Sequence, residues 1–172
     1  MAKLEVEIKA HCPDHQTIID KLISLDAQYI HSLKQDDIYF SHPSRDFNRT
    51  DEAFRIRRVN DKIFITYKGP KLGEEAKSRI EEEVEIDNFQ SMKRIAQHLG
   101  FIEFGTVSKV REVYCLGEIE ICIDKVEKLG DFIELEIISS HREEAEKELF
   151  KLASTLGLDR FERKSYLELL YE

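Results

Sequence analysis

The sequence contains no long apolar run, because its longest stretches of apolar side chains are only a few residues. A membrane-spanning helix needs about 20 consecutive, mostly apolar residues, so none is expected. The N-terminus also lacks the apolar core that a secretory signal peptide requires. We therefore expect a soluble, cytoplasmic protein that has no membrane partner.

Cysteine is scarce, with only Cys12, Cys115 and Cys122 in the chain. Their number is odd and their spacing matches no metal site. Cys115 and Cys122 also lie within strand-like stretches, where a small apolar side chain serves equally well. We expect neither disulfides nor a metal site built from cysteines.

Linkers are absent as well. The 172 residues include 41% apolar side chains, which predicts one compact domain over residues 1–172. The net charge of −9 argues against a nucleic-acid partner, since binding to a phosphate backbone needs a basic outer surface. The overall charge does not describe an interior, and lysines and arginines gathered inside a fold can still bind a small polyanion.

What the sequence does contain is alternation of charge with aliphatic residues. Near the N-terminus, Glu5, Glu7 and Lys9 alternate with Val6 and Ile8, which places the charges on one face of a strand. On one strand alone, such a face is typical of solvent exposure and surface ion pairs. Because charges of both signs recur on nearly every later strand, we predict a sheet curled around a polar interior.

The same patterns predict the order of elements. Strands are expected at residues 5–9, 29–40, 54–59, 62–68, 77–86, 107–115, 118–126, 132–138 and 163–170. Helices are expected at about residues 13–27, 87–100 and 140–157, where apolar residues follow helical spacing between start and stop signals. The polar stretch 41–52 predicts a long mobile loop.

An internal repeat organises these elements. Glu-Val-Glu-Ile occurs at residues 5–8 and again at 83–86, each time before a predicted helix and three predicted strands. Two strand-helix-strand-strand-strand halves predict an α+β fold, an eight-stranded antiparallel closed barrel with its helices packed outside. One hairpin would supply cations and its counterpart anions: Arg55, Arg57 and Lys68 against Glu120, Asp124, Glu134 and Glu136.

Such a barrel predicts a ligand. Burying charges costs several kcal/mol per ion, which their mutual pairing does not reliably return. A polyphosphate offers oxygens to arginine and lysine, and Mg²⁺ or Mn²⁺ offers positive charge to the carboxylates. We therefore expect a small-molecule triphosphate bound together with a divalent metal ion.

The charged motifs resemble those of the CYTH superfamily, also called triphosphate tunnel metalloenzymes, over essentially the whole chain. Each motif alone is weak, but their order and spacing make the set specific. The motifs are Glu-x-Glu-x-Lys (Glu5, Glu7, Lys9), Arg-x-Arg (Arg55, Arg57), a strand-end lysine (Lys68), Arg-x-Glu-x-Glu (Arg79, Glu81, Glu83), Lys-x-Arg (Lys109, Arg111) and late acidic strands (Asp124, Glu134, Glu136). Residues 42–47 and 50–55 look most like the class IV adenylyl cyclase-like subgroup.

The resemblance implies roles for these residues. The phosphates would be held by Lys9, Arg55, Arg57, Lys68, Arg79, Lys109 and Arg111. The metal would be held by Glu5, Glu7, Glu134 and Glu136. Four more carboxylates are candidates for metal binding or for support: Glu81, Glu83, Glu120 and Asp124.

The reaction depends on the nucleophile. Attack by a ribose 3′-hydroxyl on the α-phosphorus would make cyclic AMP and pyrophosphate, as in class IV adenylyl cyclases, whereas attack by water would make the protein a triphosphatase. Tyr39 is placed like a tyrosine that, in some hydrolytic relatives, is thought to activate water with a lysine such as Lys109. A polyphosphate- or nucleotide-binding module without catalysis is a third possibility. The organic group on the phosphates and the oligomeric state stay open.

Overall fold

The computed structural model describes residues 4–70 and 77–171. Its sheet contains nine antiparallel strands, ordered β5-β1-β9-β8-β7-β2-β3-β4-β6. The strands are β1 (Leu4–His11), β2 (Gln28–Ser41), β3 (Ala53–Val59), β4 (Lys62–Lys68), β5 (Lys77–Arg79), β6 (Glu81–Ile86), β7 (Ile102–Leu116), β8 (Ile119–Val126) and β9 (Gly130–Ser139).

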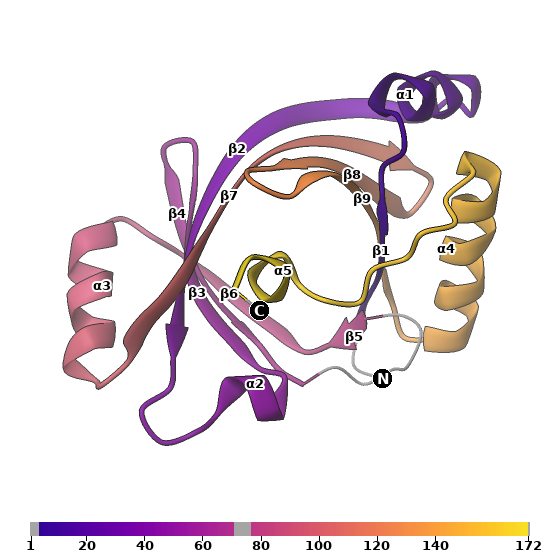
Figure 1. Ribbon diagram of the computed structural model, residues 1–172. Coiled ribbons are helices and arrows are strands. Elements are labelled where there is room, and N and C mark those ends of the chain that lie inside the picture. Colours follow the sequence, from indigo (N-terminus) through magenta and orange to yellow (C-terminus); the bar gives the residue numbers. More distant parts are fainter. Residues whose placement is uncertain (1–3, 71–76, 172) are drawn as a thin grey trace.

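The sheet closes into a ring through one interrupted strand. The two ends of the strand order, β5 and β6, are separated in the sequence only by Ile80. β5 pairs with β1, and β6 pairs with β4, so this stretch bridges the two edges. Counted as a single strand it gives eight antiparallel strands, which confirms the predicted architecture. Figure 1 shows the strands curving around a common interior.

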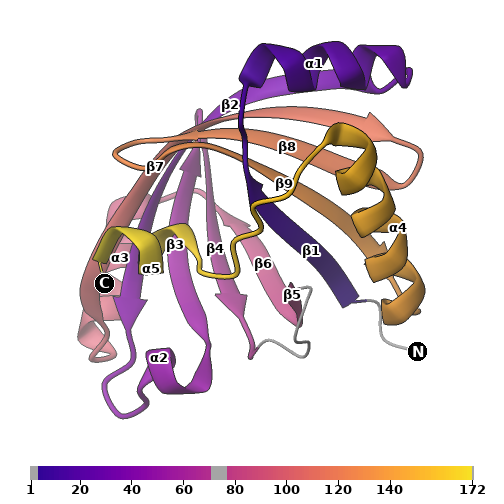
Figure 2. The ribbon, with the colours of Figure 1, turned by 45° about the vertical axis from the view of Figure 1, so that its right-hand side comes forward.

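Five helices accompany the sheet among the described residues. They are α1 (His15–Ser24), α2 (Phe47–Thr50), α3 (Phe89–His98), α4 (Arg142–Leu156) and α5 (Tyr166–Tyr171). The order strand-helix-strand-strand-strand occurs twice, interrupted only by the short α2, as the repeat predicted. Figures 1 and 2 show α1, α3 and α4 outside the ring. No helix in the described part of the chain is long and apolar enough to cross a membrane.

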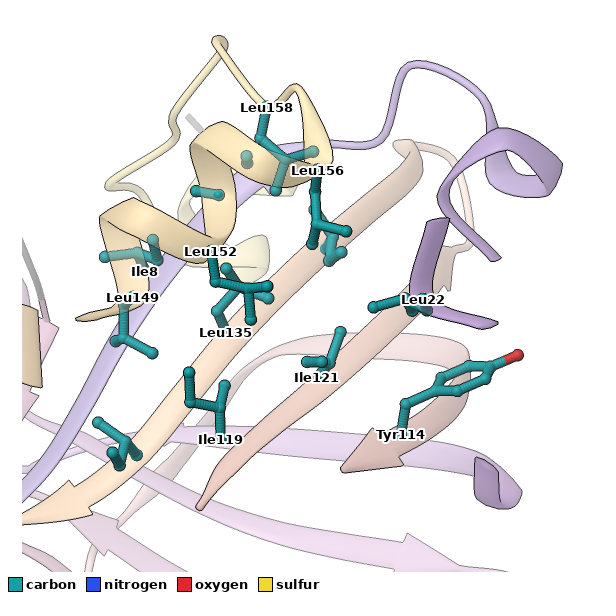
Figure 3. Packing of buried hydrophobic residues seen from close by; sticks show 14 of the residues in the cluster. Ile8, Leu22, Tyr114, Ile119, Ile121, Leu135, Leu149, Leu152, Leu156 and Leu158 are labelled. Atoms are coloured by element: carbon teal, nitrogen blue, oxygen red, sulfur yellow. The ribbon is translucent and has the colours of Figure 1, made fainter. Parts of the chain in front are cut away.

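The main apolar core lies between the outer face of the sheet and helices α1 and α4. Ile8 of β1 and Leu149 of α4 are almost fully buried there (Figure 3). Val6 of β1 belongs to the same cluster and is fully buried. Burying such aliphatic side chains contributes about 1.5–3 kcal/mol each relative to exposure. Lys21 of α1 also donates a 2.6 Å hydrogen bond to the carbonyl of Leu156, at the C-terminal end of α4. The aliphatic half of the alternation therefore anchors the helices and turns the charged half inward.

A smaller cluster lies under α3. Phe40 of β2, Ile56 of β3 and Ala96 of α3 are buried together, and Phe54 and Phe101 pack against them. The rings of Phe54 and Phe101 lie 4.9 Å apart between centroids, within the range of favourable aromatic pairs. This cluster fixes β2 and β3, whose opposite faces carry charged residues.

Two predictions from the sequence are wrong. Residues 163–170 do not form a strand, because Tyr166–Tyr171 is the helix α5. Figure 1 shows α5 within the outline of the ring rather than in its wall. The stretch 41–52 is also not one long loop, since β2 extends to Ser41 and the helix α2 occupies Phe47–Thr50.

Candidate functional site

The inward faces of the strands enclose a cavity of about 400 Å³. Strand alternation explains which residues line the cavity, because side chains two positions apart on a strand point to the same face of the sheet. Fifteen of the sixteen candidate residues line it, namely Glu5, Glu7, Lys9, Tyr39, Arg55, Arg57, Lys68, Arg79, Glu81, Glu83, Lys109, Arg111, Glu120, Glu134 and Glu136. The structure therefore brings nearly all of the predicted site residues together.

Three glutamates form an acidic group on one side of the cavity. Glu7 of β1 stands in register with Glu136 of β9, and Glu5 lies two residues before Glu7. One carboxylate oxygen from each of the three lies within 4.8 Å of the others. Hard oxygen donors in this arrangement suit Mg²⁺ or Mn²⁺. Glu134, which the resemblance also assigned to the metal, is not part of this group.

Two carboxylates of the acidic group bind protons more tightly than ordinary glutamates do. Burial raises the pKa of Glu5 to about 8, with Glu136 adding to the rise and Lys68 opposing it. Burial and the neighbouring Glu7 likewise raise the pKa of Glu136 to about 7. Protonation relieves the repulsion between these carboxylates, and a divalent cation would relieve it in the same way.

Lys68 joins the acidic group to the basic part of the cavity. Its Nζ lies 3.6 Å from Glu5 Oε1 and 2.5 Å from Glu81 Oε2. Burial alone would lower the pKa of Lys68, but the charges of Glu5 and Glu81 outweigh it and raise the pKa. The ammonium group is therefore firmly positive and lies between the two kinds of charge.

Arg55 and Arg57 of β3 share one carboxylate, that of Asp37 on β2. Arg57 donates two hydrogen bonds of 2.7 Å to Asp37, and Arg55 Nη1 lies 3.5 Å from the same group. Burial would raise the pKa of Asp37, but the two guanidinium groups hold it well below its usual range. Asp37 thus fixes both arginines at the cavity wall without filling the cavity.

Asp124 plays the same part for Lys109 and Arg111. It is the one candidate residue that does not line the cavity, and it is fully buried behind these two cations. It accepts a 2.8 Å hydrogen bond from Lys109 and two of 2.6 Å from Arg111. Arg111 also bonds Glu134. The position of Asp124 fits support of the cations rather than metal binding.

Tyr166 of α5 reaches into this group of charges. Its hydroxyl donates a 2.8 Å hydrogen bond to Asp124, and its ring lies under two ammonium groups. Lys9 Nζ is 4.2 Å from the ring centroid, and Lys109 Nζ is 4.8 Å from it. Both distances fall within the range of cation–π attraction. A single aromatic ring therefore holds two of the lysines that face the cavity.

The remaining candidates lie around this framework. Tyr39 of β2 accepts a 3.5 Å hydrogen bond from Arg55 and donates one of 3.4 Å to Asp37. Glu83 of β6 accepts a 2.9 Å hydrogen bond from Thr66. In the strand ladders, Arg79 stands opposite Glu5, and Glu120 stands opposite Glu136. The charged lining residues of the two hairpins have the predicted signs, cationic on β3–β4 and anionic on β8–β9, although each half of the chain also contributes charges of the other sign.

The sequence matches the CYTH domain over residues 3–166. The chain belongs to the CYTH family, which confirms the resemblance of its charged motifs. It is 42% identical to "Putative adenylate cyclase MJ0240" of Methanocaldococcus jannaschii, with 96% of this chain and 98% of the relative covered. It is 27% identical to "Adenylate cyclase CyaB" of Aeromonas hydrophila, covering 95% and 87% of the two chains. The solved structure of PH1819 from Pyrococcus horikoshii is similar with a TM-score of 0.86 and 40% identity, covering 96% and 97%.

Some residues at the CYTH cavity were missed from the sequence. Asp37 shares the inward face of β2 with Tyr39, and extending the alternation from Tyr39 would have found it, together with Gln35. Tyr166 lies within residues 163–170, for which the sequence predicted a strand. A capping box signals the helix instead, because Ser165 Oγ accepts a 3.2 Å bond from the Glu168 amide while the Glu168 carboxylate accepts one from the Ser165 amide.

Proposed function

We propose that this CYTH protein is a divalent-metal-dependent enzyme that binds a triphosphate inside the ring and cleaves a phosphoanhydride bond. One observation carries the proposal: seven candidate phosphate-binding cations and a compact group of three glutamates line the same cavity. A site for an anion alone needs mostly cations. The buried carboxylates opposite them are explained by a metal ion bound with the phosphates.

The cations would grip the phosphate chain from several strands. Arg57 and Arg55 present planar guanidinium groups, which suit bidentate contacts with phosphate oxygens. Their anchoring on Asp37 keeps them in place before a ligand arrives. Lys109 and Arg111 are anchored in the same way on Asp124. Such preorganisation lowers the cost of orienting side chains when the ligand binds.

The metal would be held by Glu5, Glu7 and Glu136, whose oxygens already converge. When bound, a divalent ion supplies Lewis acidity and neutralises part of the charge on the phosphates. Glu134 would serve mainly by bonding Arg111. Glu81, beside Lys68 and Arg55, would likewise support cations.

The preferred reaction is that of an adenylyl cyclase, in which ATP gives cyclic AMP and pyrophosphate. The names of the relatives at 42% and 27% identity favour it. The cavity also has uncharged lining residues beyond its cations, with Phe47, Asn48 and Ala53 in one segment and Leu33 and Val113 on neighbouring strands. An organic group needs apolar and hydrogen-bonding neighbours of this kind.

Hydrolysis of an inorganic, thiamine or nucleoside triphosphate is the second candidate. Burial and the charge of Arg111 lower the pKa of Lys109, so a larger fraction of this amine is unprotonated and able to accept a proton than in an ordinary lysine. Tyr39 lines the same cavity. We propose these two residues as the pair that would act on water if the protein is a triphosphatase.

A panel of triphosphates tests the proposal. ATP, other nucleoside triphosphates, thiamine triphosphate and tripolyphosphate are incubated with Mg²⁺ or Mn²⁺, and every product is identified. Cyclic AMP with pyrophosphate indicates the cyclase, and phosphate release indicates the triphosphatase. EDTA and the Glu136→Gln variant should each abolish turnover. Glu85→Gln is the matched control, because Glu85 is exposed on β6 and pairs with Lys62 outside the cavity. Tight binding without any product would identify a binding module and refute the enzyme.

A further inference from the structure

Gln35 is an uncharged residue on the inward face of β2, among the cations of the cavity. Its side chain lines the cavity, and the residue is only 6% exposed. In the ladder between β2 and β7 it stands opposite Lys109, and on the β3 side it stands opposite Val59. Gln35 and Lys109, one of the proposed phosphate-binding lysines, therefore line the cavity from directly opposite positions on neighbouring strands.

The amide oxygen of Gln35 is buried without a hydrogen-bond partner among the described residues. Two carboxylate oxygens share this property, but their charges are compensated. Glu52 accepts hydrogen bonds through its other oxygen from Arg45 and Tyr67, and Glu81 Oε2 lies 2.5 Å from Lys68 Nζ. Gln35 has no such compensation for its oxygen. An unsatisfied buried acceptor costs about 1–3 kcal/mol, so a functional explanation is called for.

The chemistry of the amide limits what can satisfy it. Phosphate oxygens of a bound polyphosphate are acceptors and cannot bond to the amide oxygen of Gln35. That oxygen needs an O–H or N–H group, whereas the amide nitrogen offers donors that phosphate oxygens can accept. An attacking water or ribose hydroxyl bears such an O–H and must lie against a phosphate, so it matches both ends of the Gln35 amide.

We propose that Gln35 contacts the nucleophile of the reaction and orients it toward the phosphorus. The proposal rests on the function proposed above. The amide oxygen accepts a hydrogen bond from the attacking water or ribose hydroxyl, and the amide nitrogen donates to a phosphate oxygen. The nucleophile's oxygen then bonds to phosphorus. The bridging P–O bond breaks, and its electron pair stays on the leaving group, which is pyrophosphate for the ribose hydroxyl and the rest of the phosphate chain for water. The nucleophile's proton is released to solvent. Gln35 accepts no proton and serves through orientation alone.

The test compares Gln35→Met with Lys34→Met. Methionine keeps a similar length while removing the amide, and Lys34 is the residue before Gln35 on β2, with its side chain 68% exposed. For each protein we would measure kcat and KM on the substrate that the panel identifies, binding of tripolyphosphate with Mg²⁺ by calorimetry, and thermal stability without ligand. Loss of one orienting contact should lower kcat by about a hundredfold, in the range found for single transition-state hydrogen bonds.

The expected result for Gln35→Met is a large loss of kcat with KM and tripolyphosphate binding little changed. Its stability without ligand should be equal to the wild type or higher, because an unsatisfied polar group has been removed. Lys34→Met should leave kcat unchanged. A Gln35→Met protein with normal kcat, or one that is less stable and binds tripolyphosphate poorly, would overturn the role of Gln35. A wild-type protein that cleaves nothing in the panel would overturn the proposed function itself, and with it this role.

Discussion

At the scale of single residues, the cavity depends on buried acids that hold buried bases. Asp37 and Asp124 are almost inaccessible to solvent, and each bonds two cations that line the cavity. Removing one member of such a group leaves an uncompensated buried charge, whereas the intact group gains little over apolar packing. These acids are therefore better explained by the placement of cations than by stability.

Replacement of Asp37 by asparagine should destabilise the protein by about 3 kcal/mol, because Arg55 and Arg57 then lose their shared counter-charge. Chemical denaturation at neutral pH measures the change. The control is Asp36→Asn on the same strand, since the Asp36 side chain is 42% exposed and contacts Lys34 and Ser108. That change should cost less than about 1 kcal/mol. Equal costs for the two variants would contradict the anchoring role of Asp37.

The same variant has a pH signature. The pKa of Asp37 in the folded protein lies below its ordinary value because of Arg57 and Arg55. A carboxyl of this kind stabilises the fold above its ordinary pKa, and the contribution is lost as the pH falls toward the folded value. Asp37→Asn should therefore lose less stability than the wild type when the pH is lowered from about 5 to 2, because it has no such contribution to lose.

At the scale of elements, helix α5 contributes more than its six residues suggest. It carries Tyr166, whose ring contacts Lys9 of β1 and Lys109 of β7. At its far end, the Tyr171 hydroxyl accepts a 3.0 Å hydrogen bond from the Thr106 amide of β7. The helix is thus attached to the sheet at both ends, and its first residue completes the cavity wall.

Tyr166→Leu should weaken binding of Mg²⁺–tripolyphosphate by about tenfold, because it removes the ring that positions Lys9 and Lys109. Each cation–π contact of this kind contributes about 0.5–2 kcal/mol. Tyr166→Phe keeps the ring and should keep most of the affinity, while losing about 1 kcal/mol of stability with the hydrogen bond to Asp124. Calorimetric titration and denaturation separate the two effects. Tyr171→Phe serves as the control at the other end of α5. Identical affinities for the Leu and Phe variants would show that the ring does not position the lysines.

The elements also show how far prediction from the sequence reaches. Alternation located the strands and the inward residues because one face of each strand is aliphatic and packs under a helix, as Val6 and Ile8 do. It failed at residues 163–170, where Lys164 and Tyr166 suggested a strand, although Tyr166, Leu169 and Leu170 also fit helical spacing. A six-residue helix is set by its capping box and its contacts with other elements, and the contacts are not visible in a local pattern.

The contacts between individual charged residues of the site were harder to predict than their place on the inner face. Period-two spacing correctly placed Glu5, Glu7, Glu134 and Glu136 on the inner face of the sheet. It could not show which of these carboxylates would lie close to one another. The ladder sets Glu7 beside Glu136 and Lys9 beside Glu134, so only three glutamates form the acidic group and Glu134 turns to Arg111. Register between strands far apart in sequence decides this, and no single strand contains that information.

At the scale of the whole molecule, the cavity makes stability depend on pH and ligand together. Glu5 and Glu136 have folded pKa values of about 8 and 7, both above the ordinary value of 4.5. An acid whose pKa is raised on folding binds more protons in the folded state, so the free energy of unfolding decreases as pH rises through the interval from about 4.5 to 8. The ligand-free protein should accordingly be at least about 1 kcal/mol less stable at pH 8 than at pH 5.5.

Tripolyphosphate with Mg²⁺ should remove this difference in stability between pH 5.5 and pH 8, because bound metal requires the glutamates to be ionised. Any ligand that binds only the folded state also stabilises it by mass action, by about 2.7 kcal/mol at one hundred times its dissociation constant. Melting curves at pH 5.5 and 8, with and without the ligand, measure the effect. Glu136→Gln should flatten the ligand-free pH dependence. A ligand-free stability that rises between pH 5.5 and 8 would contradict the raised pKa values.

The contact between Lys9 and Tyr166 also has a consequence for folding during synthesis, because it joins two segments that are far apart in the sequence. On the ribosome, β1 emerges before its sheet partners β5 and β9 and before its aromatic neighbour on α5. Closing contacts over such long stretches of chain is slow compared with forming local ones. A growing chain therefore carries the charged face of β1 without β9 until Gly130–Ser139 have been made, and without Tyr166 until α5 follows. A chain that stops before β9 would lack Glu136, so it would lack one of the three glutamates of the acidic group.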